Sequence, residues 1–199
     1  MTEAAPISTQ RPLGGFVVRV IAWLPAAFFV WYFAAPVLTW PAAFIVELVA
    51  RAGFGDIVRG IAQSGSTLTF ATALQPGESG AKAGQITVGV NMLLYAYGLP
   101  LYAALVLAAR EPHWGRRLAY GYAALTPFVA WGVLADFLKN VAISAGPLVA
   151  SQTGFVAWQR EAIAFAYQMG SLILPTVAPA VAWVVSHQAF LERLRRVVV

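Results

Sequence analysis

The sequence predicts an α-helical integral membrane protein with four transmembrane helices. A small extracytoplasmic α+β insertion, an amphipathic helix plus a β-hairpin, is expected between helices 1 and 2. Three observations predict this class. Hydrophobic residues make up 60% of the 199 residues and charged residues only 11%, whereas about a quarter of a soluble domain is charged. The mean hydropathy is +0.71. Four stretches are apolar over about the 20 residues that cross the hydrocarbon core of a bilayer.

The four apolar stretches are the expected spans of a single membrane domain, residues 1–199. They cover residues 16–38, 92–109, 118–141 and 162–185. The second stretch is the shortest. The first follows Arg11 as a signal peptide would, but it is longer than the roughly 7–15 apolar residues of a signal peptide. We therefore expect a retained membrane anchor.

The distribution of basic residues predicts the orientation of the chain. If the N-terminus is cytoplasmic, one side of the membrane holds Arg11, Arg19, Arg110, Arg116, Arg117, Arg193, Arg195 and Arg196. The opposite side holds at most Arg51, Arg59, Lys82, Lys139 and Arg160. The positive-inside rule therefore places both termini in the cytoplasm. The basic tail, residues 187–199, either lies on anionic lipid as an amphipathic segment or only stops transfer, which is the plainer interpretation.

The insertion, residues 39–91, begins with a helical pattern over residues 41–52. Four apolar residues recur there at helical spacing: Phe44, Ile45, Leu48 and Val49. Glu47 and Arg51 are four residues apart in the order that favours an ion pair on a helix. We expect this amphipathic helix to lie along the outer boundary between membrane and water.

The rest of the insertion alternates with the period of a β-strand. Residues 67–74 and 85–90 interleave apolar and other residues, and a polar Gly-rich loop joins them. The sequence predicts a hairpin whose edge accepts a strand from a partner, with Phe70 and Val88 as candidate partner-docking residues. The equally supported alternative is a hairpin that packs on the protein itself or on the bilayer.

Four charges lie at the outer ends of the third and fourth expected spans. We expect cross-helix ion pairs, Asp136 with Arg160 and Lys139 with Glu161. Such a network is either a structural clamp, which we favour because two acids balance two bases, or a catalytic or proton-relay site. Nearby, Ala162, Ala166 and Gly170 form a stripe of small residues at a spacing of four. This stripe lets another helix approach closely, either from this chain or from another subunit.

The sequence predicts no catalytic, cofactor-binding or metal-binding residues. It has no cysteine, which excludes disulfides, thiolate metal sites and a cysteine nucleophile. It contains no HExxH, GxSxG or phosphate-binding Gly-rich motif. Its two histidines, His113 and His187, lie far in sequence from each other and from any carboxylate cluster. Because the basic residues form no contiguous face, nucleic acid is not an expected partner.

Three runs of sequence resemble a known family. They are RVIAWLP at residues 19–25, VNMLLYAYGLPL at 90–101, and WQRE at 158–161 followed by YQMG at 167–170. They resemble the small membrane proteins called exosortase H-associated. This resemblance implies an accessory role in a bacterial inner membrane, beside an exosortase. Exosortases are polytopic sorting peptidases that process proteins with a C-terminal anchor. The chemistry attributed to them uses a Cys with Arg and His, which a chain without cysteine cannot perform.

Three function classes compete. The first is a non-catalytic accessory or scaffold protein, with membrane lipids and an exosortase-like peptidase as partners. The second is a small transporter or channel subunit, but polar residues within the spans are sparse. The third is an intramembrane enzyme that uses the outer-facing charged cluster. We rank them in this order and expect a protein that is not an enzyme.

Overall fold

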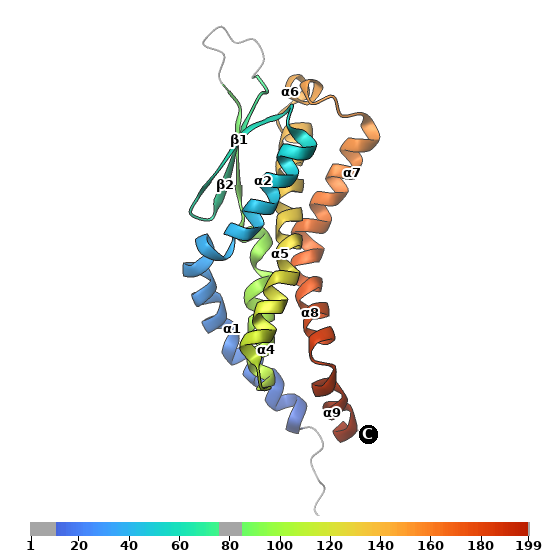
Figure 1. Ribbon diagram of the computed structural model, residues 1–199. Coiled ribbons are helices and arrows are strands. Elements are labelled where there is room, and N and C mark those ends of the chain that lie inside the picture. Colours follow the sequence, from blue (N-terminus) through green and yellow to red (C-terminus); the bar gives the residue numbers. More distant parts are fainter. Residues whose placement is uncertain (1–10, 76–84, 199) are drawn as a thin grey trace, which may run out of the picture.

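The computed structural model describes residues 11–75 and 85–198. The described chain is elongated, and its long helices run roughly along one axis (Figure 1). A small sheet lies at one end, which we call the sheet end. The described chain begins and finishes at the other end, which we call the terminal end (Figure 1). The described elements are, in order, α1 (Arg11–Leu38), α2 (Trp40–Phe54), β1 (Val58–Ser64), β2 (Thr67–Thr72), β3 (Thr87–Asn91), α3 (Leu93–Ala96), α4 (Gly98–Ala109), α5 (Trp114–Lys139), the π-helical turn η1 (Asn140–Ser144), α6 (Pro147–Gln152), α7 (Ala157–Gln168), the π-helical turn η2 (Met169–Ile173), α8 (Leu174–Ser186) and α9 (Gln188–Val198).

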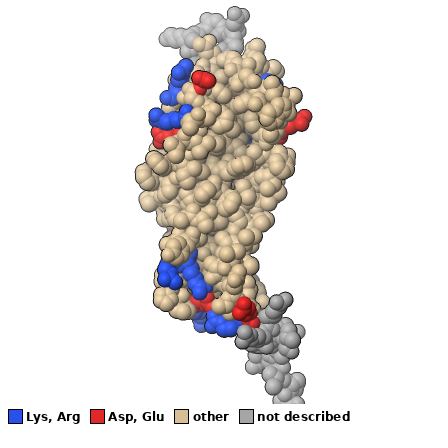
Figure 2. Space-filling view, turned by 45° about the vertical axis from the view of Figure 1, so that its right-hand side comes forward, with Lys and Arg blue, Asp and Glu red and all other residues tan. Residues whose placement is uncertain are grey.

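Within the described ranges, three helices are long and apolar enough to cross a membrane. They cover Leu13–Leu38, Trp114–Ser144 and Ala157–Ser186. A shorter apolar helix, Leu93–Ala109, occupies the place of the second expected span. Charged side chains gather toward the two ends of the molecule and leave a broad uncharged belt between them (Figure 2). This is the charge distribution of a protein whose middle lies in lipid.

Helix α5 lies at the centre of the helical bundle. It packs against α2, α4, α7 and α8, while α4 also packs against α1 and α8. Helix α5 and η2 approach each other closely, because a Cβ added at Gly170 would stand 2.7 Å from the Cα of Gly132. Gly170 belongs to the stripe of small residues seen in the sequence. The helix that approaches this residue is therefore α5 of the same chain.

The sheet has three antiparallel strands in the order β1-β2-β3, where the sequence predicted a two-stranded hairpin. The two expected strands are present as β2 and β3, with Phe70 opposite Val88. Strand β1 was missed because its side chains do not alternate cleanly, and an irregularity interrupts its pairing between Val58 and Gly60. It pairs along β2, so that Ile61 lies opposite Phe70.

The sheet is attached to the bundle through an aromatic stack. The Phe70 and Phe137 rings lie parallel, with centroids 4.1 Å apart and an interplanar angle of 15°. Both side chains are completely buried. Leu68 and Val90 belong to the same core cluster. The sheet is thus part of the fold of α5 and its neighbours rather than a separate appendage.

Helix α2 confirms the expected helix and buries mainly its small residues. The residues that it buries are Ala42, Ala43, Val46 and Ala50, and it packs along α5. Alanine faces let two helix backbones approach closely, so the small residues rather than the large ones turn inward. Phe44 and Leu48 are exposed. The expected ion pair is confirmed, with 2.6 Å between Glu47 and Arg51.

Candidate functional site: a lateral groove and two charged clusters

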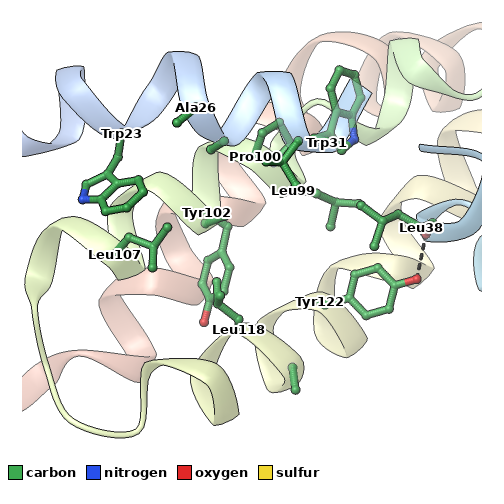
Figure 3. A pocket seen from close by; sticks show the side chains of 14 residues that line it. Trp23, Ala26, Trp31, Leu38, Leu99, Pro100, Tyr102, Leu107, Leu118 and Tyr122 are labelled. Atoms are coloured by element: carbon green, nitrogen blue, oxygen red, sulfur yellow. Dashed lines mark hydrogen bonds between the residues drawn. The ribbon is translucent and has the colours of Figure 1, made fainter. Parts of the chain in front are cut away.

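A groove of about 440 Å³ lies between α1, α4 and α5. Its lining is apolar apart from the tips of aromatic side chains (Figure 3). Its lining side chains include Trp23, Ala26, Ala27, Val30, Trp31 and Leu38 from α1, Leu99, Pro100, Tyr102, Ala103 and Leu107 from α4, and Leu118, Ala119 and Tyr122 from α5. We call it the lateral groove.

The lateral groove exists because small side chains stand between large ones. Ala26 and Ala27 on α1 leave a gap, and Ala103 on α4 and Ala119 on α5 leave others. In Figure 3, Trp23 and Leu107 lie toward one end of the groove, and Leu38 toward the other. The sequence analysis did not find this site, because alanines within a membrane helix carry no signal that separates a groove from ordinary packing.

Both tyrosine hydroxyls of the lateral groove are engaged by backbone carbonyls. The hydroxyl of Tyr102 donates to the carbonyl oxygen of Arg117 at 3.0 Å. The hydroxyl of Tyr122 donates to the carbonyl oxygen of Leu38 at 2.7 Å (Figure 3). A hydroxyl that is already bonded need not find a partner in a ligand. The groove therefore offers an occupant an almost entirely apolar surface.

The four charges predicted as a cross-helix network have different partners in the structure. Lys139 Nζ lies 3.1 Å from Asp136 Oδ1 on the same helix and 4.3 Å from the centre of the Tyr167 ring. Arg160 Nη2 donates to the carbonyl oxygen of Ala150 at 3.3 Å. The expected pairs, Asp136 with Arg160 and Lys139 with Glu161, are absent from the ion pairs of residues 11–75 and 85–198.

The difference has a geometric reason. Residues three apart on a helix are neighbours, so Asp136 and Lys139 meet without crossing to another element. The side-chain amide of Asn140 adds a hydrogen bond to Asp136 Oδ1 at 3.0 Å. Arg160 and Glu161 instead border a separate cavity of about 410 Å³, beside η1 and α6. Asp136 is therefore paired within α5.

A second charged cluster lies at the terminal end, and the sequence analysis missed it. The carboxylate of Glu111 is buried and forms ion pairs with Arg117 and Arg193. Arg117 Nη1 also donates to the carbonyl oxygen of Ser186 at 3.1 Å. The cluster ties the α4–α5 connection to α8 and α9. Sequence separation conceals it, since Glu111 and Arg193 are 82 residues apart.

His187 lies beside this cluster in space, although it is far from Glu111 in sequence. Its ring is buried, stacks on Trp183 with centroids 5.2 Å apart, and has Nδ1 2.9 Å from the hydroxyl of Ser186. Burial lowers the pKa of His187, and the charge of Arg117 lowers it further, while Glu111 and a hydrogen bond to Trp183 oppose the shift. His187 is therefore a neutral, structural side chain near neutral pH.

The clusters show what kinds of chemistry the described residues bring together. No group of three or more His, Cys, Asp or Glu side chains that could hold a metal ion occurs among them. Asp136 is paired with Lys139, and Glu111 is paired with Arg117 and Arg193. The lateral groove is apolar. The arrangement is suited to binding lipid or another membrane protein.

A comparison with protein families decides the identity of the chain. The model of the family described as exosortase H-associated membrane protein matches residues 10–190. The chain belongs to this family. No curated protein and no solved structure matches at a significant level. Family membership confirms the resemblance in the three sequence runs and makes this an exosortase H-associated membrane protein.

Proposed function

We propose that this exosortase H-associated protein is a non-catalytic accessory protein that binds the exosortase H peptidase in the bacterial inner membrane. The observation that carries the proposal is the family match over residues 10–190. In this arrangement α1, the α3–α4 segment, α5 and the α7–α8 segment are the four spans. Both termini lie in the cytoplasm, because most basic residues are at the terminal end. The sheet end then faces the extracytoplasmic side.

The exposed edge of β3 supports docking of a partner at the sheet end. Antiparallel strands alternate residues that bond to the neighbour with residues that do not. The backbone N–H of Met92 donates to Ser66, and the carbonyl of Ile86 accepts from Thr72, so these two residues bond toward β2. By alternation, the N–H of Thr87 points away from β2. An edge of this kind accepts a strand from another chain.

The two docking residues suggested by the sequence have unequal positions in the structure. Phe70 is completely buried in the stack with Phe137, so it holds the sheet in place rather than meeting a partner. Val88 is half-buried on β3. Docking therefore depends on the β3 edge. The exposed face of α2, where Trp40 and Phe44 stack with centroids 6.3 Å apart, adds an aromatic surface at the same end.

Processing of an exosortase H substrate in living cells tests this function. A strain that lacks the chromosomal copy of this chain is compared with the same strain carrying a plasmid copy. The ratio of processed to unprocessed substrate is measured by immunoblotting. We expect unprocessed substrate to accumulate without the chain and processing to return with the wild-type chain. Normal processing without the chain would contradict an accessory role in sorting.

A pair of substitutions at Thr87 tests the docking edge. Proline removes one outward N–H at a position where an edge strand tolerates it, so Thr87→Pro should lower processing at an unchanged level of folded chain. Thr87→Ala keeps the N–H and is the matched control. Equal processing by the two variants would remove the β3 edge from the interface and leave the accessory role to be decided by the deletion strain.

A further inference from the structure

We infer that the lateral groove binds one acyl chain of an anionic phospholipid, with the headgroup at the terminal end beside Arg110 and Arg116. The inference concerns a lipid site and does not depend on the proposed role beside exosortase H. It rests on three features of the described structure: the width of the groove, its lining, and the charges at one of its ends.

The dimensions of the groove fit a hydrocarbon chain. On α1 its lining extends from Trp23 to Leu38, which spans about 22 Å at 1.5 Å per residue. The groove has a volume of about 440 Å³, so it is long and narrow. A helix with its side chains is about 10 Å across. The groove therefore accepts an extended chain along its length, whereas a helix could insert only side chains.

The lining of the groove leaves an occupant little to hydrogen-bond. The hydroxyls of Tyr102 and Tyr122 are bonded to the carbonyls of Arg117 and Leu38. The remaining lining residues are alanines, leucines, a valine, a proline and two tryptophans. An acyl chain brings no polar group of its own, so its burial adds no unpaired donor or acceptor. The indole N–H of Trp31 is already buried without a hydrogen-bond partner in the described structure.

The terminal end of the groove is basic. Leu107 near the end of α4 and Leu118 near the start of α5 both line the groove. Arg110 directly follows α4, and Arg116 lies in the first turn of α5. Both arginines are exposed, and neither forms an ion pair with another side chain in the described part of the protein. Basic residues gather at this end of the molecule, below the uncharged belt (Figure 2). Such residues attract anionic headgroups.

Native mass spectrometry of the full chain tests the site. The protein is reconstituted in an equimolar mixture of phosphatidylglycerol and phosphatidylethanolamine, extracted in mild detergent, and the lipid retained per chain is counted. Wild type should retain one phosphatidylglycerol. Ala26→Phe fills the groove and should reduce retention at least fivefold. Ala180→Phe is the matched control, because Ala180 is an exposed alanine on α8 that does not line the groove, and it should retain lipid like wild type.

The headgroup site is tested separately with the double substitution Arg110→Gln and Arg116→Gln. The variant should keep a lipid but lose its preference for phosphatidylglycerol over phosphatidylethanolamine by about 30-fold, which corresponds to about 1 kcal/mol for each arginine. An unchanged preference would overturn the assignment of the headgroup.

A measurement on chains with an open groove keeps the inference testable if Ala26→Phe fails to fold. Trp31 lines the groove but is only 8% exposed, so surrounding lipid scarcely reaches it. Phospholipid brominated on its acyl chain should quench the fluorescence of Trp31. The fluorescence of Trp31 is obtained as the difference between the emission of wild type and that of Trp31→Phe. Absence of this quenching would overturn the inference, and so would equal lipid retention by the Ala26→Phe and Ala180→Phe chains. The inference would also be wrong if wild type retained no lipid and Ala26→Phe lost co-purified exosortase H, because the groove would then bind the peptidase.

Discussion

The aromatic stack between β2 and α5 gives the sharpest test of the fold. Phe70→Ala removes one ring of a pair that is completely buried, with centroids 4.1 Å apart. Truncating a buried Phe to Ala costs about 3–5 kcal/mol, because it loses transfer free energy and leaves a cavity. Because the ring is completely buried, we expect the loss to fall in the upper part of this range.

The ring–ring contribution can be separated from the cavity by a double-mutant cycle. Phe137→Ala and the double variant complete the cycle, and the coupling energy should be about 0.5–1.5 kcal/mol, as for a specific aromatic pair. Thr69→Ala is the matched control on the same strand. Its side chain points to the opposite face of β2 and is half-buried, so we expect a loss below about 1 kcal/mol.

The assay is reversible unfolding of the purified protein in detergent micelles by titration with sodium dodecyl sulfate, followed by circular dichroism. The free energy of unfolding is compared among wild type, the two single variants, the double variant and the control. If Phe70→Ala were as stable as the control while exosortase H no longer co-purified, the ring would belong to the docking surface. The packing of the sheet on α5 would then be wrong.

Three further predictions concern the bundle and its terminal end. Asp136→Asn leaves the half-buried Lys139 without its counter-ion and should lower the free energy of unfolding by about 1–3 kcal/mol. This is less than for a fully buried pair because both side chains are partly exposed. Adding Lys139→Met should recover part of the lost stability. Gly170→Leu places a side chain where Gly132 lies 2.7 Å away, and it should lower the yield of folded protein in the membrane by overpacking, whereas Gly170→Ala should be milder. Because the pKa of His187 is lowered in the folded protein, the unfolded chain binds more protons than the folded one between that pKa and about 6.5. The unfolding midpoint should therefore fall as pH falls through this window, and His187→Phe should abolish the dependence. A midpoint independent of pH in wild type would contradict the burial of a neutral ring.

The helices that could cross a membrane were predictable because length and hydropathy are local properties of the sequence. The three long helices and the shorter Leu93–Ala109 helix coincide with the expected stretches. The α2 helix was also predictable from its spacing, but its inward face was not. Periodicity identifies an apolar stripe, whereas the neighbouring helix α5 selects alanines such as Ala42 and Ala50 for close packing over Phe44 and Leu48.

The contacts that join distant segments were not predictable in the same way. Strand β1 gains its structure from pairing with β2, since its own residues, including Arg59 and Gly60, do not alternate. The predicted partner of Asp136, Arg160, was wrong because Lys139 lies on the same helix and pairs with Asp136 instead. The Glu111 cluster and the lateral groove both depend on three helices meeting, which no single segment of sequence encodes. Membership of the family was recognisable from short runs of sequence alone.

The most direct test of the account is whether this chain and exosortase H form a complex in the membrane. The chain carries an affinity tag at its C-terminus, membranes are extracted in mild detergent, and exosortase H is quantified by mass spectrometry in the eluate. The same measurement is then made with the tag on exosortase H. The account predicts recovery of both proteins in a constant ratio from either tag, and the ratio should survive a size-exclusion step. Recovery of the tagged chain with exosortase H left entirely in the unbound fraction, in both directions, would contradict it.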